Sequence, residues 1–203
     1  MGGVKSLETK RLILRPWEPE DAGFVLDLYS RWEVQRFIGN HPQVMREFAE
    51  AEERIRVWRT MDHSLHGAWA VQLKEAVQLK KAAQLKEPLQ SKSTPPLAGT
   101  LLLKSIPASG ETLPLQPSGD TEIGWHFHPD CWGHGYATEA AAAVLTYALG
   151  GGLDRVVAVT APANAASQRV CQRIGMTHLG QTNRYYNALC ELFEARAART
   201  TPP

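Results

Sequence analysis

The sequence predicts a mixed α/β fold in which a mostly antiparallel sheet is flanked by helices. Three observations point to it: strand segments come early in the chain, helical segments separate the later strands, and a hairpin ends the chain. Elements in this order form a mixed sheet with helices on both faces. With 203 residues and 43% hydrophobic content, the chain suits a single domain over residues 1–203 with one sizeable core.

The first predicted elements are one strand and two amphipathic helices. Residues 11–15 form the strand, which Pro16 ends. A helix begins near Pro19, and its apolar side chains at helical spacing are Ala22, Val25, Leu26 and Tyr29. The second helix covers residues 44–61, with an apolar stripe at Phe48, Ala51, Ile55 and Trp58. Each stripe predicts one buried helix face.

Two further strands enclose the least regular part of the chain. Alternating apolar residues predict a half-buried strand at 69–73, and residues 99–106 give the next one. Between them a segment ending in Gln-Leu-Lys recurs with a six-residue period, and a stretch with proline and serine follows. This composition predicts a low-complexity, dispensable surface insertion at about 75–96. A loop over 107–120 then joins two strands of a hairpin.

The second half of the chain alternates strands with helices. Its predicted elements are a strand over 122–128, a helix over 136–149, a strand over 155–160, a helix over 164–174 and hairpin strands near 177–182 and 189–194. Asn164 is placed to cap its helix, and Gly175 stands where a glycine commonly ends one. A short tail, 197–203, ends the chain.

The loop before the helix at 136–149 is the most informative segment. Its glycines, Gly133 and Gly135, let a turn gather several backbone N–H groups into one concavity. The helix adds the unpaired N–H groups and the positive dipole end of its first turn. Such a strand, loop and helix unit holds a pyrophosphate. The sequence therefore predicts a phosphate-binding loop over residues 132–137.

The two strand-and-helix units together resemble the GNAT superfamily of acyl-CoA-dependent N-acetyltransferases. The motifs are Glu122-Ile123-Gly124-Trp125, Trp132-Gly133-His134-Gly135-Tyr136-Ala137-Thr138-Glu139-Ala140, and Asn164-Ala165-Ala166-Ser167 followed by Ile174-Gly175-Met176. Their wording is similar to the ribosomal-protein-alanine acetyltransferase (RimJ/RimL-like) branch, and the resemblance extends from Leu7 to Phe193. It implies the GNAT acyl-CoA N-acyltransferase fold, with the first two helices bordering the acceptor groove.

The resemblance implies an activity and its partners. The expected reaction transfers acetyl from acetyl-CoA to a primary amine, either a protein N-terminus or a small molecule, by direct attack in a ternary complex. Acetyl-CoA is then a co-substrate, no metal is needed, and a homodimer is a common assembly among relatives. The residues expected to bind coenzyme A are Phe127, His128, Trp132, Gly133, His134, Gly135, Tyr136, Ala137, Thr138, Asn164 and Ser167. Position 132, where the family has Arg or Gln, is expected to pack rather than pair a charge.

Three residues are candidates for proton transfer. Glu122 shares a strand face with Gly124 and His126, so its carboxylate is placed to deprotonate an ammonium through water. Its structural alternative is a pairing with a nearby arginine or amide. The resemblance makes Ser167 the proton donor to the thiolate, and a tyrosine phenol is a second candidate. Tyr185 is the expected one, and at most one of Tyr185 and its neighbour Tyr186 can face the cleft from a strand.

The composition excludes several classes of protein. A net charge of +1 gives no electrostatic footprint for nucleic acid, and no apolar run is long enough to span a membrane. Three irregularly spaced cysteines, Cys131, Cys171 and Cys190, argue against a disulfide scaffold and fit a reducing, cytoplasmic location. The N-terminus lacks a signal-peptide core, although its glycines match the formal myristoylation pattern.

Two alternative functions stay open at this point. His126, His128, Cys131 and His134 form a conceivable zinc set, since two imidazoles share a strand face and a thiolate and third imidazole follow. A non-catalytic acyl-CoA-binding sensor would keep the fold and lose the chemistry. A dinucleotide site fits poorly, because Thr138 stands where the third glycine of that motif belongs.

Overall fold

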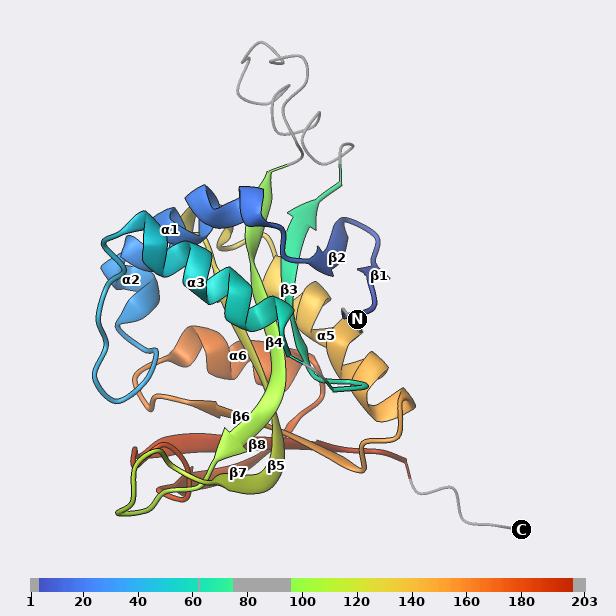
Figure 1. The fold of residues 1–203 in the computed structure, drawn as a ribbon. Coiled ribbons are helices and arrows are strands. Elements are labelled where there is room, and N and C mark those ends of the chain that lie inside the picture. The colour runs from blue at the N-terminus through green and yellow to red at the C-terminus, as the bar shows by residue number, and fades with distance from the viewer. Residues whose placement is uncertain (1–3, 62, 75–95, 199–203) are drawn as a thin grey trace.

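The strands form one eight-stranded sheet in the computed structural model, which describes residues 4–61, 63–74 and 96–198 (Figure 1). The strands are β1 (Leu7–Glu8), β2 (Leu12–Pro16), β3 (Gly67–Leu73), β4 (Leu97–Pro107), β5 (Pro117–Phe127), β6 (Arg155–Thr160), β7 (Thr177–Thr182) and β8 (Cys190–Arg196). They lie in the order β1-β2-β3-β4-β5-β6-β8-β7, and all neighbours are antiparallel except β5 and β6. The predicted mixed, mostly antiparallel sheet is confirmed.

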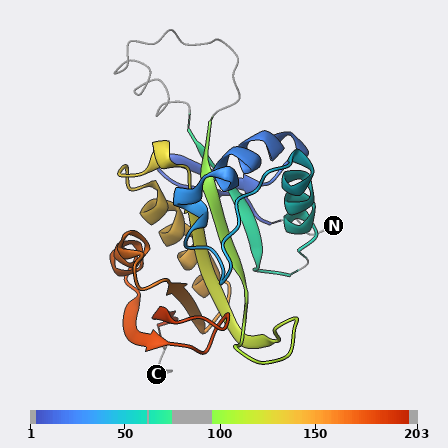
Figure 2. The same ribbon diagram turned by 90° about the vertical axis from the view of Figure 1, so that its left-hand side faces the viewer.

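Helices cover both faces of this sheet (Figure 2). They are η1 (Pro19–Asp21), α1 (Ala22–Ser30), α2 (Trp32–Gln35), α3 (Phe48–Arg59), η2 (Pro129–Cys131), α5 (Tyr136–Gly150) and α6 (Ala165–Arg173). In Figure 2, α1 and α3 lie on one side of the central strands, and α5 and α6 lie on the other. Each face therefore has its own hydrophobic cluster.

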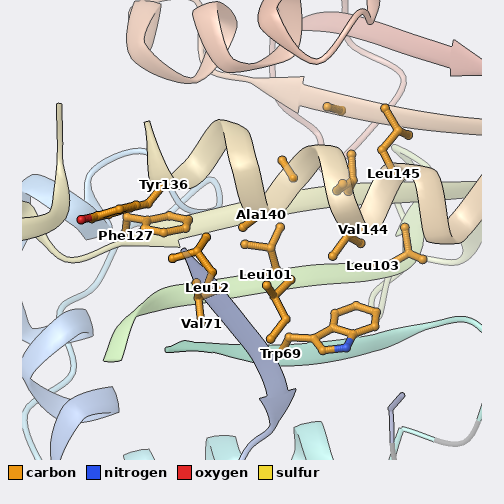
Figure 3. Close-up of a cluster of buried hydrophobic side chains, with 14 of the residues drawn as sticks. Leu12, Trp69, Val71, Leu101, Leu103, Phe127, Tyr136, Ala140, Val144 and Leu145 are labelled. Carbon is orange, nitrogen blue, oxygen red and sulfur yellow. The ribbon is translucent and has the colours of Figure 1, made fainter. Parts of the chain in front are cut away.

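The larger cluster joins α5 to strands β2 to β5 (Figure 3). Ala140 and Val144 of α5 are fully buried against β-strand side chains such as Trp69 and Leu101. The alanines let the helix backbone lie close to the sheet, because their side chains add little thickness. Phe127, the last residue of β5, and Tyr136, the first of α5, pack at one end of this cluster.

Aromatic side chains dominate the second cluster, under α1 and α3. Trp17, Tyr29 and Trp58 are buried there with Val25 and Ile55. Because helices cover both faces, every residue of β3 is buried, and the predicted half-buried strand is wrong. A capping box between Glu47 and Glu50 begins α3 later than the predicted residue 44.

The remaining differences concern ends and connections. The hairpin strands β4 and β5 extend further than predicted, so their connection is residues 108–116 rather than 107–120. Gly175, with φ of +81°, ends α6 as predicted. The predicted insertion lies outside the described residues except for Pro96, as does the tail beyond residue 198. No helix within the described residues is long and apolar enough to cross a membrane.

Candidate active site

The loop between η2 and α5 presents a row of unpaired backbone N–H groups. Within the described residues, the N–H groups of residues 133–138 have no hydrogen-bond acceptor, and the first bond of the helix runs from Glu139 N to Gly135 O at 3.1 Å. Gly133 and Gly135 have φ of +78° and +76°, a left-handed region that glycine adopts at low cost. Consecutive N–H groups at a helix N-terminus bind anions. The predicted phosphate-binding loop therefore has the geometry to hold a pyrophosphate.

Arg11 fixes the first turn of α5 beside this loop. Its Nε lies 2.6 Å from an oxygen of Glu139, its Nη1 donates to the carbonyl of His134 at 2.9 Å, and its guanidinium stacks over Tyr136 at 4.7 Å. Burial raises the pKa of Glu139, but hydrogen bonds from Thr9 and Arg11 outweigh it and hold that pKa below its ordinary value. Arg11 thus pairs with the carboxylate of Glu139 in the first turn of α5, beside the loop. Sequence reasoning missed Arg11, because a lone arginine before a strand carries no local signal.

Side chains around the loop mostly serve the fold. Trp132 donates its indole N–H to the carbonyl of Phe127 at 2.7 Å, and its side chain is 47% exposed. The Phe127 and Tyr136 side chains belong to the core cluster. His134 is exposed and stacks on Tyr136 with ring centroids 5.4 Å apart.

His128 is buried, with Nε2 3.0 Å from an oxygen of Asp27. Ala137 and Thr138 lie half-buried in the first turn of α5.

The second motif begins α6. The Asn164 side chain accepts a hydrogen bond from the N–H of Ser167 at 3.2 Å, so the predicted helix cap is confirmed. The Ser167 hydroxyl is half-buried and has no hydrogen-bond partner among the described residues. It therefore keeps its donor for a ligand, although a role in catalysis stays a prediction.

Glu122 lies at the junction of the sheet's only parallel pair among the described strands. The β5–β6 register is recorded at a single position, Glu122 opposite Val157, so beyond it the two strands are not paired. The Glu122 side chain is buried, and its Oε2 accepts a hydrogen bond from the phenol of Tyr186. Lys104 Nζ lies 3.4 Å from the same oxygen and donates to the Tyr186 phenol at 2.7 Å. Burial, together with the Glu122 charge, raises the pKa of Tyr186 far above its ordinary value, so the phenol stays a donor.

Tyr186, and not the expected Tyr185, is the tyrosine that contacts Glu122. Tyr185 is buried, its phenol donates to Asp120 at 2.6 Å, and it packs with Ile106 and Val157. Tyr185 forms an isolated bridge with Ala108, and Tyr186 follows in a turn with φ of 58°, so the two do not lie in a strand that would alternate them. Of the two, Tyr186 reaches Glu122, whereas Tyr185 bonds Asp120, and a role of either phenol in proton transfer stays a prediction.

The zinc set is contradicted. Within the described residues, no group of three or more His, Cys, Asp and Glu side chains could hold a metal ion. His126 Nδ1 is 2.8 Å from the Tyr29 phenol, and His128 contacts Asp27. Cys131 is buried in the core beneath α5, whereas His134 is exposed. The four residues therefore point into different environments.

His126 belongs to a polar network under α1 and α3. The Tyr29 phenol joins its Nδ1 to Thr100 Oγ1, which is 3.3 Å away from the phenol. Burial lowers the pKa of His126 to about 3, and the positive charges of Arg54 and Lys104 act in the same direction. The imidazole is therefore neutral at any physiological pH.

Together, the fold and the site define a class of protein. Among the described residues, one parallel strand pair precedes a row of N–H groups without acceptors, which fits an acyl-CoA-dependent transferase. The model of the acetyltransferase (GNAT) domain matches residues 11–177, and the chain belongs to this family of N-acetyltransferases.

Known proteins agree with this assignment. YoaA of Bacillus subtilis (strain 168), an uncharacterized N-acetyltransferase, is 26% identical over 181 residues, which cover 88% of this chain and 86% of YoaA. A GNAT acetyltransferase from Bacillus anthracis superposes with a TM-score of 0.66 at 22% identity, covering 94% of this chain and 96% of its own. RimL, a ribosomal alpha-N-protein acetyltransferase solved with coenzyme A, superposes with a TM-score of 0.68 at 15% identity, covering 95% and 98%. The structural matches show the shared fold.

Proposed function

We propose that the protein transfers an acetyl group from acetyl-CoA to a primary amine, a protein N-terminus or a small molecule, as enzymes of the RimJ/RimL-like branch do. One observation carries the proposal: a single strand, β5, has the buried Glu122 carboxylate where it pairs with β6, and it ends just before the loop that contains the N–H groups of residues 133–138. Strand β5 thus leads from a candidate proton acceptor to the candidate phosphate site.

Coenzyme A would bind mainly to backbone groups that have no hydrogen-bond acceptor among the described residues. The N–H groups of residues 133–138 would hold the pyrophosphate, with Gly133 and Gly135 supplying the backbone conformation. Asn164 and Ser167 at the start of α6 would contact the thioester-bearing arm. The match to RimL, whose structure contains coenzyme A, supports this assignment.

The chemistry needs two proton movements. The amine nitrogen attacks the thioester carbonyl carbon, the new C–N bond forms, and the C–S bond breaks. Glu122 accepts the proton that the nitrogen loses, directly or through water, and Tyr186 and Lys104 hold its other oxygen in place. The Ser167 hydroxyl and the first turn of α6 would stabilise the thiolate, which gains one proton, so protons balance over the turnover.

A covalent acetyl-enzyme is not needed. Burial raises the pKa of the Cys171 thiol to about 12, and burial together with the Glu122 charge raises that of Cys190. Both groups are therefore thiols at neutral pH, and a thiol is a weak nucleophile. These environments favour direct transfer within a ternary complex.

The test is a screen of acetyl-CoA consumption against N-terminal peptides, polyamines, amino acids and aminoglycosides. We expect at least one class of primary amine to be acetylated, and Glu122→Gln to lower that turnover by on the order of 100-fold with acetyl-CoA affinity nearly unchanged. Tight acetyl-CoA binding without turnover of any amine would overturn the proposal and favour a sensor.

A further inference from the structure

The face of β5 that carries Glu122 has an open position next to it. One face of β5, directed toward α1 and α3, carries Glu122, Gly124 and His126. On this face Gly124 lies opposite Leu102 of β4. A Cβ placed on Gly124 would have one neighbour within 4 Å, the Leu102 Cβ at 4.0 Å, and Gly124 is only half-buried. Space over Gly124 is therefore open, and a polar side chain stands on either side of it.

On one side of Gly124, one carboxylate oxygen of Glu122 has no hydrogen-bond partner among the described residues. Tyr186 and Lys104 both approach Oε2. Oε1 has no hydrogen-bond partner among the described residues. It is not fully buried, since it is not among the buried polar atoms that lack a partner. Since a carboxylate oxygen accepts two hydrogen bonds, Oε1 is accessible and unsatisfied.

On the other side of Gly124, one ring nitrogen of His126 has no hydrogen-bond partner among the described residues. Nδ1 is engaged by the Tyr29 phenol at 2.8 Å. Nε2 has no hydrogen-bond partner within the part of the chain that the structure describes. It is not among the polar atoms that are buried without a partner, so it is accessible. The imidazole therefore presents Nε2 to an accessible space while Tyr29 fixes its ring.

We propose that the acceptor's amine nitrogen sits over Gly124 and donates hydrogen bonds to Glu122 Oε1 and to His126 Nε2. This inference rests on the proposed function and adds His126 and Gly124 as acceptor-binding positions. Residues two apart on a strand lie about 6.6 Å apart, so one nitrogen over Gly124 is within reach of side chains on both sides. A primary amine supplies the two or more N–H donors that this site requires.

The surrounding network accommodates the tautomer that an amine needs. An ammonium only donates, so it binds the imidazole whose Nε2 carries a lone pair and whose Nδ1 carries the hydrogen. Nδ1–H then donates to the Tyr29 oxygen, and the Tyr29 phenol donates to Thr100, which uses both contacts of Tyr29. Burial keeps the ring neutral, and Arg54 and Lys104 act in the same direction, so His126 itself adds no positive charge at the site.

Kinetics with the best amine of the screen tests the site. Gly124→Ala fills the open space, and we expect at least a tenfold rise in the KM for amine with the KM for acetyl-CoA within about twofold. His126→Leu should act likewise, and His126→Gln, which keeps an acceptor, should recover part of the loss. Gly150→Ala is the control, because Cβ there meets nothing within 4 Å at the far end of α5. Unchanged amine KM in both Gly124→Ala and His126→Leu would overturn the proposal.

An NMR measurement tests it without turnover. In the coenzyme A-bound protein labelled with ¹⁵N-histidine, we expect the His126 Nε2 resonance, assigned with His126→Gln, to be that of an unprotonated nitrogen. It should shift on titration with propylamine, and the shift should vanish in Gly124→Ala. An Nε2–H tautomer, or a resonance that propylamine leaves in place, would overturn the inference even if acetyl transfer is observed. Failure of transfer with every amine would count against the proposed function alone.

Discussion

The phenol of Tyr186 donates a hydrogen bond to Oε2 of Glu122 across 64 residues of sequence. Lys104 lies against both groups, so a protonated phenol and an ammonium hold one oxygen of a buried carboxylate. This arrangement orients Glu122 and leaves its other oxygen for a substrate. It also explains why two adjacent tyrosines have different roles, since Tyr185 bonds Asp120 instead.

The first prediction compares these two tyrosines. Tyr186→Phe removes one charge-assisted hydrogen bond from Glu122, which is worth about 1.5–3 kcal/mol. We expect kcat to fall by about tenfold or more, with acetyl-CoA affinity unchanged. Tyr185→Phe is the matched control and should lower the melting temperature while leaving kcat within about twofold. Equal kcat values for the two variants would contradict the assignment, and steady-state kinetics with thermal melts make the comparison.

The conformation of the loop over residues 132–137 was predictable from the sequence because its signal is local. Gly133, Gly135 and the helix that follows are contiguous, and a turn that needs positive φ selects glycine by itself. The cap at Asn164 and the glycine at 175 are local in the same sense. Strand alternation likewise placed Glu122 on the face opposite the core residue Ile123.

The partners of those residues were not predictable, because they come from distant segments. Arg11 reaches Glu139 across 128 residues, and Tyr29 reaches His126 across 97. Their contacts depend on the strand order, which places β2 and α1 beside elements encoded much later. Alternation in the sequence located β3 but predicted one solvent-facing side, because the helices that cover both of its faces come from distant segments.

A second prediction tests the phosphate-binding loop. Gly133→Asp introduces a carboxylate among the free N–H groups, where a Cβ meets nothing within 4 Å. We expect at least a tenfold loss of coenzyme A affinity by calorimetry, about 1.4 kcal/mol. Gly152→Asp carries a similar backbone penalty, since its φ is +105° and it too has open space, but it lies after α5. Equal affinities in the two variants would remove the loop from the coenzyme site.

The third prediction concerns Arg11. Arg11→Gln leaves the Glu139 carboxylate uncompensated in the first turn of α5, where it repels a bound phosphate. Charges at a helix terminus contribute about 0.3–1 kcal/mol, and up to about 2 kcal/mol when partly buried, so we expect a loss of coenzyme A affinity of several-fold to tenfold. Adding Glu139→Gln should restore part of it.

Pantetheine, which lacks the pyrophosphate, separates charge from structure in this test. Its affinity should not change in Arg11→Gln if the effect is electrostatic. Lys74→Gln, which breaks the more exposed pair with Glu8, is the control and should leave coenzyme A binding intact. A double variant as weak as Arg11→Gln would show that Arg11 acts through the fold and not through charge.

The last prediction is an acid sensitivity set by His126. Burial, reinforced by Arg54 on α3 and Lys104 on β4, lowers its pKa from 6.5 to about 3, while Tyr29 on α1 contacts its ring. Between these pH values the unfolded chain binds a proton that the folded chain does not. The free energy of unfolding therefore falls as pH drops from 6.5 toward 3, by up to about 1.4 kcal/mol per pH unit from this residue.

His126→Gln isolates that contribution, because glutamine does not titrate. Denaturant unfolding of both proteins should give a difference in unfolding free energy that is constant above pH 6.5 and shifts against the wild type as pH falls below it. Carboxylates titrate in both proteins and cancel in this difference. Parallel curves from pH 7 to pH 4 would show that His126 is readily protonated in the fold. It would then repel an ammonium rather than accept its hydrogen bond, and the site over Gly124 would lose its second acceptor.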